Sequence, residues 1–323
     1  MGACRGLGCS RLRGLRDHGR SRQSRDRRAP AHTGPPGAAV LKRILVLRPE
    51  GVEPALILAG RIADACEQAG VEVTVAGAWG HVPAEALADA DLIICAGGDG
   101  TVLRAARLAV PRPLPILGVN MGRLGFLTTL NRDAFFDQFD RIVAGDWEVE
   151  ERLMVSATIT EGEASGRSFR GLNDIVLSRR SPGRPVYVEL AVDGERVALY
   201  RCDGMIVATP TGSTGYSLSA GGPILAPVER HLVVTPVSAH LAIGRSLVLE
   251  PSSTVTLNIR SDEGAILTVD GQEDLRLAGG ARVSLTASEY AAHFALLDPP
   301  SSFFGHLAER LEVQLSSAMN NGD

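Results

Sequence analysis

The sequence predicts two domains, an α/β N-terminal domain with a parallel sheet followed by an all-β C-terminal domain. The first observation is length, because 323 residues are about twice the size of an average domain. The second is that strand patterns and amphipathic helix patterns alternate over residues 40–146, which is typical of a parallel sheet covered by helices on both faces. The third is that helical periodicity largely disappears over residues 147–286, where short apolar segments indicate a sandwich or stacked sheets.

Residues 1–39 precede these domains and differ from them in composition. They hold nine arginines, no lysine and two aspartates, without apolar periodicity, so we predict a disordered arginine-rich arm. Such arms act in some proteins as organelle presequences or nucleic-acid tails. Because arginine replaces lysine everywhere except at Lys42, arginine clusters carry less information in this chain, and we favour an extension without a role.

Apolar spacing and turn residues define the elements of the first domain. Leu56, Ile62 and Cys66 follow a helical period, and Gly70 stands where that helix should stop. Pro111 prevents the next helix from continuing, because proline lacks the N–H that a helix interior needs. The predicted strands are residues 40–47, 71–75, 92–96 and 114–119, and the predicted helices are residues 53–69, 101–109 and 133–144.

The second domain consists of short segments rich in valine, isoleucine, leucine and threonine. Asp193-Gly194, between two of these segments, is a strong β-hairpin signal. The predicted strands are residues 155–160, 174–178, 186–192, 196–201, 204–208, 246–249, 254–259, 266–269 and 281–285. Near the end of the chain, apolar residues spaced by four predict a helix over residues 303–315.

The composition excludes several kinds of function. Aromatic residues make up only 4 % of the chain and the net charge is −4, so we expect no nucleic-acid partner. Since Lys42 is the only lysine, the chain has no Walker P-loop and no lysine in the protein-kinase position. The same scarcity leaves almost no candidate for a Schiff base.

Cysteine, histidine and apolar patterns exclude further classes. The five cysteines are scattered without a Cys-x-x-Cys pair, and the histidines lack metal-ligand spacing. We therefore expect neither a disulfide framework nor a zinc site, and we place the chain in the reducing cytoplasm. The longest uncharged stretch, residues 205–228, has too many glycines, prolines and hydroxyls for a membrane helix, so we expect no membrane partner.

The first candidate site is Gly-Gly-Asp-Gly-Thr at residues 97–101, directly after a buried strand and at the start of a helix. Glycines let the backbone approach a ligand closely, and a helix N-terminus favours anions such as phosphate. Asp99 would repel a phosphate, so its carboxylate needs another role, as a general base or a Mg²⁺ ligand. Alternatively, Asp99 is only the helix N-cap. The Rossmann motif Gly-x-Gly-x-x-Gly is absent, because Leu103 takes the place of its third glycine.

The second candidate site is residues 203–217, where an apolar strand enters a loop dense in hydroxyls and glycines. Hydroxyls and free amides can hydrogen-bond ribose, base edges or phosphate without carrying charge. The segment is long for an ordinary turn between strands, so we favour a binding loop.

Other candidates are weaker when taken alone. Asn173-Asp174 fits either a binding pair or an Asx turn ahead of a strand. Arg123 follows a predicted strand, and it either meets an anion or is a surface arginine. We interpret residues 270–272, Asp-Gly-Gln, as a hairpin turn, and His240 as a structural histidine.

Taken together, these segments resemble the NAD kinase family. The resemblance rests on residues 97–101, 120–127 and 173–174, and above all on the string Thr-Pro-Thr-Gly-Ser-Thr-Gly-Tyr-Ser-Leu-Ser-Ala-Gly-Gly at residues 209–222. It covers about residues 40–315. Lipid and sugar-phosphate kinases share Gly-Gly-Asp-Gly, so another kinase with this motif is one alternative. A non-catalytic NAD(P)-binding sensor is a second.

The resemblance implies an α/β domain with a Rossmann-like sheet at residues 40–146 plus about 287–316, and a β-rich NAD-binding domain at residues 147–286. It also implies that the C-terminal segment returns to the first domain. The implied reaction moves a phosphoryl group from ATP or inorganic polyphosphate to the adenosine-ribose 2′-hydroxyl of NAD, giving NADP. A divalent metal, Mg²⁺, and a homo-oligomer, dimer or tetramer, are implied as well.

Carried over residue by residue, Asp99 is the general base that takes the 2′-hydroxyl proton. Asn173 and Asp174 bind the adenosine portion of NAD, and Asp203 contacts the nicotinamide or its ribose, from the same or a neighbouring subunit. Gly215 stands where alanine is usual and Asp174 where glutamate is frequent, which affects the pocket rather than the reaction. No metal ligand is assigned, because phosphates are expected to hold most of the Mg²⁺. The implied nucleotide-binding residues are Gly98, Gly100, Thr101, Arg104, Asn173, Asp174, Arg201, Asp203, Thr211, Thr214, Gly215, Tyr216 and Ser219.

Overall fold

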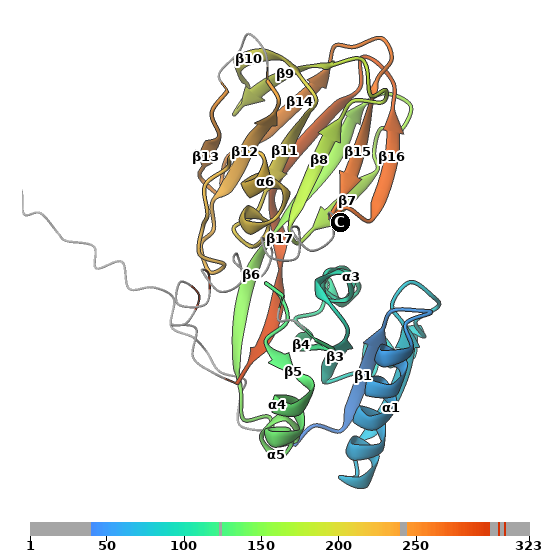
Figure 1. Ribbon diagram of the computed structural model, residues 1–323. Helices are drawn as coiled ribbons and strands as arrows, with labels where there is room; N and C mark the ends of the chain where they lie inside the picture. Colours follow the sequence, from blue (N-terminus) through green and yellow to red (C-terminus); the bar gives the residue numbers. More distant parts are fainter. Residues whose placement is uncertain (1–39, 123–124, 240–243, 298–302, 304–306, 308–323) are drawn as a thin grey trace, which may run out of the picture. The chain divides into compact units, whose positions relative to one another are not determined.

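The computed structural model of the chain describes residues 40–122, 125–239, 244–297, 303 and 307 (Figure 1). The predicted arm at residues 1–39 lies outside the described residues. So does most of the predicted terminal helix, of which Phe303 and Leu307 are described and are helical.

Four parallel strands form the sheet of the first half: β1 (Arg43–Arg48), β2 (Glu72–Gly77), β3 (Leu92–Ala96) and β4 (Pro115–Asn120). Their order is β4-β3-β1-β2. Successive residues of β1 enter two different cores, Leu45 and Leu47 on one face and Ile44 and Val46 on the other. Burial on both faces is typical of a parallel sheet covered by helices, and it confirms the predicted α/β class.

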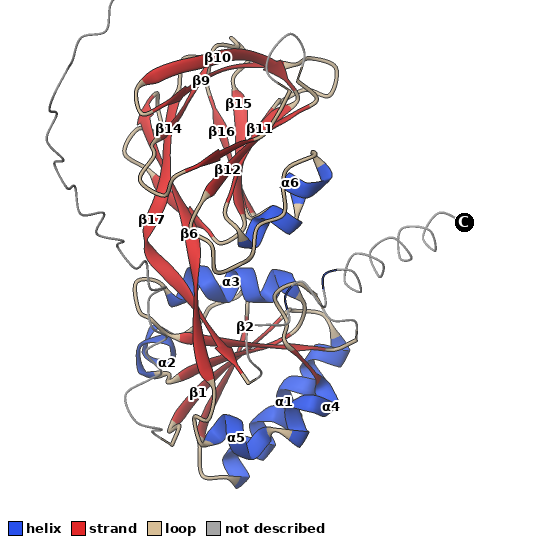
Figure 2. Ribbon diagram, turned by 90° about the vertical axis from the view of Figure 1, so that its left-hand side faces the viewer, coloured by secondary structure: helices blue, strands red, loops and turns tan. Residues whose placement is uncertain are grey.

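Helices cover both faces of these strands (Figure 2). Helices α1 (Glu53–Gln68), α4 (Arg132–Asp137) and α5 (Phe139–Val143) pack on the face of Ile44, and α2 (Ala84–Asp89) and α3 (Asp99–Ala109) pack on the other. The predicted helix over residues 133–144 is divided into α4 and α5. The division falls at Gln138, whose φ of −107° and ψ of 12° leave the helical range.

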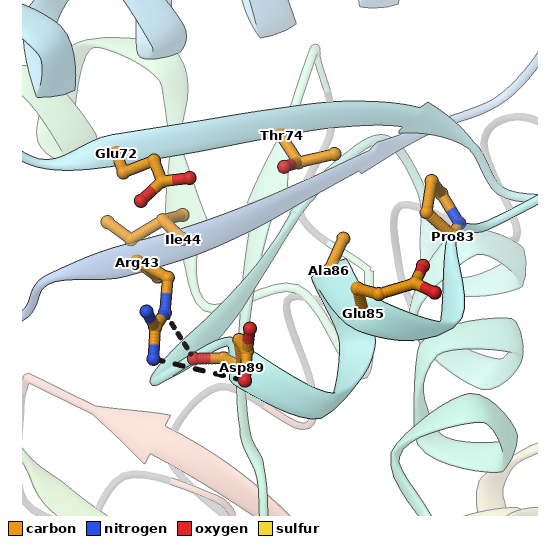
Figure 3. A pocket seen from close by; sticks show the side chains of 8 residues that line it. All are labelled: Arg43, Ile44, Glu72, Thr74, Pro83, Glu85, Ala86 and Asp89. Carbon is orange, nitrogen blue, oxygen red and sulfur yellow. Dashed lines mark hydrogen bonds and ion pairs between the residues drawn. The ribbon is translucent and has the colours of Figure 1, made fainter.

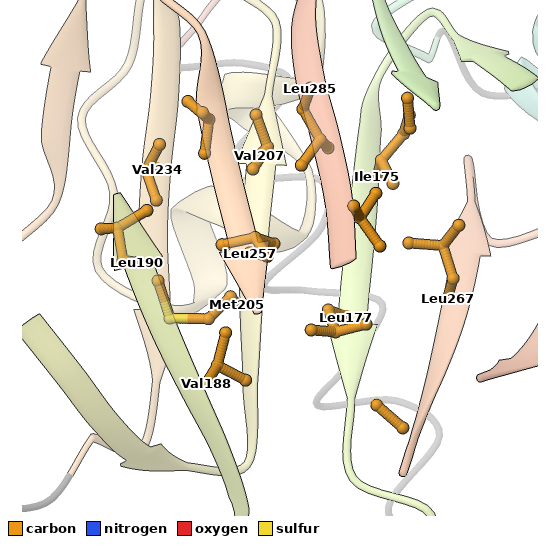
Figure 4. Packing of buried hydrophobic residues seen from close by; sticks show 14 of the residues in the cluster. Ile175, Leu177, Val188, Leu190, Met205, Val207, Val234, Leu257, Leu267 and Leu285 are labelled. Atoms are coloured by element: carbon orange, nitrogen blue, oxygen red, sulfur yellow. The ribbon is translucent and has the colours of Figure 1, made fainter. Parts of the chain in front are cut away.

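The second half is a β sandwich. One of its sheets has the antiparallel strands β13 (Leu247–Leu249), β12 (Leu232–Val237), β11 (Gly204–Ala208), β8 (Asp174–Ser178), β15 (Ala265–Val269) and β16 (Glu273–Leu277), in that order. The facing sheet contributes β9 (Val186–Val192), β10 (Glu195–Cys202) and β14 (Val255–Ile259). Between them, Leu177 and Met205 pack in one cluster with Val188, Leu190 and Leu257 (Figure 4). This apolar layer buries the inward residues of both sheets.

Two long strands connect the halves. Strand β6 (Glu148–Glu161) pairs antiparallel with β17 (Arg282–Leu296), and the two lie side by side in Figure 1. Strand β17 also pairs with β14 near its start and, at His293 and Phe294, with β4 of the parallel sheet. The predicted return of the chain to the first domain is therefore confirmed by β17. The proposed domain boundaries at residues 146 and 286 stay a prediction.

Several elements were not predicted. They are α2, β5 (Leu130–Asn131), β7 (Ser168–Gly171), β12, β16 and two short helices, η1 (Thr211–Thr214) and α6 (Tyr216–Ser219), in the segment predicted as a loop. Strand β12 contains Pro236, and proline argues against a strand in the interior of a sheet. Strand β16 lies at the edge of its sheet and is mostly exposed, so it lacks the apolar alternation that predicts a strand.

Candidate active site

The segment Gly-Gly-Asp-Gly-Thr connects the carboxyl end of β3 to the start of α3. Gly98 is the N-cap residue of α3, so the alternative that Asp99 is the N-cap is wrong. A Cβ on Gly97 would lie 2.5 Å from Thr101 Oγ1, which explains the need for glycine there. Gly98 is exposed and has open space around it, and Thr101 is buried. The loop therefore leaves Asp99 free for a role outside its own helix.

The Asp99 carboxylate binds the loop that follows β4. Its Oδ2 accepts a hydrogen bond from the Phe126 N–H at 2.9 Å, and its Oδ1 accepts one from the Leu127 N–H at 3.1 Å. A Cβ on Gly125 would overlap the same carboxylate. Asp99 thus joins the ends of two neighbouring strands, which is where ligands bind in sheets of this kind. The predicted anion contact Arg123 lies outside the described residues.

A second group of polar residues gathers where β8 begins. Backbone N–H groups of Leu172, Asn173 and Asp174 donate to the Asp270 carboxylate, at 3.0, 2.8 and 3.2 Å. The side-chain Oδ1 of Asn173 is buried and has no hydrogen-bond partner among the described residues. Asn173 Oδ1 therefore closes no Asx turn, which is the alternative that the sequence left open for the Asn173-Asp174 pair.

The hydroxyl-rich loop packs directly on this segment. Thr209 donates its N–H to Asn173 O at 2.9 Å and its hydroxyl to Leu172 O at 2.5 Å. A Cβ on Gly212 would overlap the Asn173 carbonyl oxygen. Thr211 Oγ1 is also buried without a partner in the described part of the chain. Buried polar atoms are nearly always paired, and Asn173 Oδ1 and Thr211 Oγ1 are two of the six described buried side-chain atoms without a partner, which makes this segment a candidate ligand site.

The remaining residues of this loop differ in exposure. The loop forms a short 3₁₀ helix, η1 (Thr211–Thr214), and a single turn, α6 (Tyr216–Ser219). The Thr214 hydroxyl donates to Thr211 O at 3.3 Å and is thereby engaged within the loop. Gly215, Tyr216 and Ser219 are exposed to solvent, in contrast to the buried residues of η1.

The turn at residues 270–272 links the two groups. Asp270 holds the Asn173 segment, and Gln272 Nε2 donates to Gly100 O at 2.9 Å. Gln272 Oε1 accepts from Arg107 Nη2 at 2.7 Å. Arg104 of α3 donates to Ala78 O at 3.0 Å and lies 3.9 Å from Glu273. The prediction of a hairpin turn was right, but its side chains connect the predicted sites, and no local sequence signal distinguishes this turn from Asp193-Gly194.

Two buried carboxyl groups meet at this junction. Asp174 is 6 % exposed, and burial, together with the charge of Asp270, raises its pKa to about 7. Burial also raises the pKa of Asp270, against hydrogen bonds from three backbone N–H groups and the nearby charge of Arg107. Near neutral pH the Asp174 carboxyl is partly protonated. It can therefore donate a hydrogen bond to a hydroxyl or accept one from it.

Two predicted site residues lie elsewhere. In the β8–β11 pair, Ala208 is opposite Asp174 and Gly204 is opposite Ser178, so Asp203 is at the far end. That strand length is about 16 Å. Asp203 forms an ion pair with Arg179 at 3.2 Å. Arg201 lines a different pocket of about 460 Å³.

Another pocket, of about 260 Å³, lies on the first half and contains none of the predicted site residues. It is lined by Arg43, Ile44, Glu72, Thr74, Pro83, Glu85, Ala86 and Asp89 (Figure 3). Within the described residues, no group of three His, Cys, Asp or Glu side chains could hold a metal ion. None of the helices described is long and apolar enough to cross a membrane.

Comparison with known proteins identifies the family. Residues 57–147 match the ATP-NAD kinase N-terminal domain, and residues 172–297 match the ATP-NAD kinase C-terminal domain. The chain is 40 % identical over 267 residues to the NAD kinase of Heliobacterium modesticaldum, which covers 80 % of this chain and 94 % of that protein. The chain belongs to the NAD kinase family. It is therefore a kinase, and the predicted resemblance is confirmed.

Further relatives agree with this membership in the NAD kinase family. The NAD kinase of Gemmatimonas aurantiaca is 43 % identical over 225 residues, 68 % of this chain and 77 % of that protein. The NAD kinase from Archaeoglobus fulgidus, solved in complex with ATP, is 30 % identical with a TM-score of 0.69, over 84 % of this chain and 98 % of that one. Yeast NADH kinase complexed with NADH has a TM-score of 0.76 over 87 % of this chain and 92 % of that one, and at 22 % identity it supports the fold alone.

The two NAD kinase domain matches divide the candidate site between them. Asp99 and Gly100 lie in the N-terminal match, whereas Asn173, Thr211 and Gln272 lie in the C-terminal match. The hydrogen bond from Gln272 to Gly100 therefore joins one family domain to the other.

Proposed function

We propose that this chain transfers a phosphoryl group from ATP or inorganic polyphosphate to the 2′-hydroxyl of the adenosine ribose of NAD, giving NADP. The observation that carries this proposal is that hydrogen bonds connect the loop of Asp99 to the polar residues at the start of β8. One carboxylate at a glycine-rich bend is tied, through Gly100 and the 270–272 turn, to the orphaned oxygens of Asn173 and Thr211. Membership in the NAD kinase family supports the same reaction.

The acceptor NAD is proposed to bind at the start of β8. Asn173 Oδ1 and Thr211 Oγ1 are buried acceptors without protein partners among the described residues, so they suit the donor groups of an adenosine. Asp174 suits a ribose hydroxyl, because its partly protonated carboxyl can donate or accept. The proposed remaining contacts of the dinucleotide are Thr214, Gly215, Tyr216 and Ser219.

Asp99 is proposed to act as the general base. As the ribose oxygen bonds to the transferred phosphorus, its proton moves to the carboxylate, and the bond from phosphorus to the donor's leaving oxygen breaks. The N–H groups of Phe126 and Leu127 orient the carboxylate, and each oxygen keeps a lone pair for a hydroxyl. This arrangement supports a base that is positioned before the substrate arrives.

The phosphates of the donor are proposed to lie at the Gly98 bend. Gly98 is exposed, and Gly100, Thr101 and Arg104 occupy the first turns of α3 beside it. One carboxylate with no acidic cluster among the described residues fits a Mg²⁺ ion that is held mainly by phosphate oxygens. When bound, that ion neutralises charge on the phosphates.

Asp203 and Arg201 are proposed to serve the site of a neighbouring subunit. Within one chain Asp203 precedes the end of the β8–β11 pair that is opposite to Asp174, and Arg201 lines a pocket together with Arg179 and Arg180. A homo-oligomer, dimer or tetramer, would allow them to contact the nicotinamide portion of an NAD bound to another copy. We also propose a cytoplasmic location, which suits the buried free thiols of Cys66, Cys95 and Cys202.

The test is an NADP-formation assay on the purified protein, with ATP and polyphosphate run in parallel. Asp99→Asn is expected to lower kcat by about 10²–10⁴-fold while the Kd for NAD stays within about threefold. Asp91→Asn is the matched control, because Asp91 also accepts two backbone hydrogen bonds, from Lys42 and Arg43, but lies away from the site. Unchanged kcat in Asp99→Asn would contradict the base role, and no NADP from the unmodified protein would contradict the function.

A further inference from the structure

We infer that the turn at residues 270–272 is a positioning element for phosphoryl transfer, and that Gln272 is its key positioning residue. It sets the backbone that carries Asp99 at a fixed place relative to the segment that binds the acceptor. This inference rests on the proposed function, and it adds residues that act through others rather than on the substrate.

Asp270 holds residues 172–174, the segment that is proposed to bind the acceptor NAD. Its carboxylate is 7 % exposed and accepts the three N–H groups of Leu172, Asn173 and Asp174. Hydrogen bonds to a charged acceptor are stronger than those between neutral groups, so they restrain the backbone at Asn173 directly. Asp270 also has a φ of 50°, a conformation that only a few residue types adopt readily.

The Gln272 half holds the bend that carries Asp99. Its Nε2 donates to Gly100 O at 2.9 Å, and its Oε1 accepts from Arg107 at 2.7 Å. Arg107 has only 9 % of its side chain exposed and lies 3.6 Å from Glu273. Because Arg107 can only donate, it fixes which end of the amide faces Gly100.

These contacts connect parts of the chain that are distant in sequence. Gln272 and Gly100 are 172 residues apart, and Asp270 and Asn173 are 97 apart. Proton transfer requires the carboxylate and the hydroxyl to be within about 3 Å, and a misplacement of about 1 Å can reduce rates about 100-fold. Loss of the Gln272 contact would leave both half-sites folded but out of register, so kcat should fall while NAD binding is retained.

The competing explanation is that Gln272 only stabilises the fold. The variant Gln272→Glu distinguishes this stabilising role from the positioning role. The glutamate keeps an acceptor for Arg107, so the brace to α3 survives. It loses the N–H donor and turns a carboxylate oxygen toward the Gly100 carbonyl, which removes the contact to the Asp99 bend.

The experiment compares Gln272→Glu, Gln272→Ala and a control, Asp274→Asn, in the complete chain. Asp274 lies in the same hairpin and accepts from Thr268 at 2.6 Å, without an α3 contact among those described. We expect both Gln272 variants to lose about 10–100-fold in kcat, with KM for NAD within about threefold. We expect Gln272→Glu to keep its Tm within about 2 °C. The control should match the unmodified protein.

Two results would overturn the inference. One is unchanged kcat in Gln272→Glu, and the other is a fall in kcat that tracks a fall in Tm across the variants. Hydrogen exchange of the peptide spanning residues 97–103 gives a readout without activity, and it should be faster in Gln272→Glu. If the unmodified protein makes no NADP, the proposed function fails, whereas unchanged exchange at residues 97–103 specifically contradicts the Gln272 link.

Discussion

The chain contains two Asp-Gly hairpin turns that share positive φ at both residues but differ in loop length, two residues against three, and in surroundings. Asp193-Gly194 joins β9 to β10, with φ angles of 52° and 84°, and Asp270-Gly271 joins β15 to β16, with φ angles of 50° and 65°. Positive φ at both central residues is the reason that Asp-Gly is favoured in such turns. Local chemistry therefore accounts for the Asp-Gly pair in both turns, although the second loop has one residue more than the first.

The surroundings of the two aspartates separate them. Asp193 is exposed, and its Oδ1 accepts a hydrogen bond from the Thr254 N–H at 2.7 Å. Asp270 is buried and accepts three N–H groups from another segment. The comparison teaches that the same dipeptide can close a surface hairpin or anchor a site, and that only tertiary packing decides which.

The largest difference in stability between the two turns should appear when the aspartate carboxylate of each turn is removed. Asp270→Ala leaves three backbone N–H groups without their acceptor, at about 1–3 kcal/mol for each buried donor, so we expect at least about 3 kcal/mol of lost stability. Asp193→Ala should cost about 1 kcal/mol, since its single partner can reach water. Urea unfolding of both variants measures the difference. Equal losses would remove the distinction between the turns.

A smaller difference in stability, between a variant beside Asp270 and a variant at Asp193, should depend on pH. The pKa of Asp174, beside Asp270, is raised to about 7, whereas an aspartate in the unfolded chain titrates near pH 4. Between these values the folded chain holds the extra proton, so stability falls as pH rises from about 4 to about 7. Relative to the unmodified protein, the free energy of unfolding of Asp174→Asn should rise by about 1–3 kcal/mol over that window, because asparagine has no proton to lose. Asp193→Asn serves as the reference, and a pH-independent gap between Asp174→Asn and the unmodified protein would refute the buried-pair explanation.

The smallest difference in stability should come from the glycines. Gly271→Ala and Gly194→Ala both place a Cβ in open space, so each should cost only the positive-φ penalty of about 1–2 kcal/mol. Only Gly271→Ala should also lower kcat, because it strains the turn that holds Asn173 and Gly100. Thermal unfolding and steady-state kinetics on the pair test this, and equal kcat in both variants would speak against a positioning role for the turn.

Much of the fold could be predicted because the buried strands have unambiguous patterns. The predicted bounds of the strand at residues 92–96 coincide with β3, and all of its residues are buried. Strand β17 was predicted only over residues 281–285, because its later residues Ala287, Ser288 and Glu289 have low strand propensity. Pairing with β6 extends it.

The candidate site was predicted less completely. Asp99 and Thr211 could be selected because they stand beside glycines at the ends of strands, and Asn173 because the Asn173-Asp174 pair resembles the NAD kinase family. Spacing along the chain does not give the distance between strand ends, so the separation of Asp203 from Asp174 could not be predicted. Gln272 was not selected, because its two partners, Gly100 and Arg107, lie in α3. The residues next to Gln272 in the sequence do not indicate these distant contacts.

The continuous ribbon of β6 and β17 constrains how the molecule can move. Both halves contribute strands to one hydrogen-bonded sheet, so they cannot swing apart like two bodies on a flexible tether. The pairing of β6 with β17 is irregular between Ala287 and Ala291, and such an irregularity interrupts the ladder locally and increases its twist. The two halves of the chain therefore share one continuous network of backbone hydrogen bonds instead of a single-stranded linker.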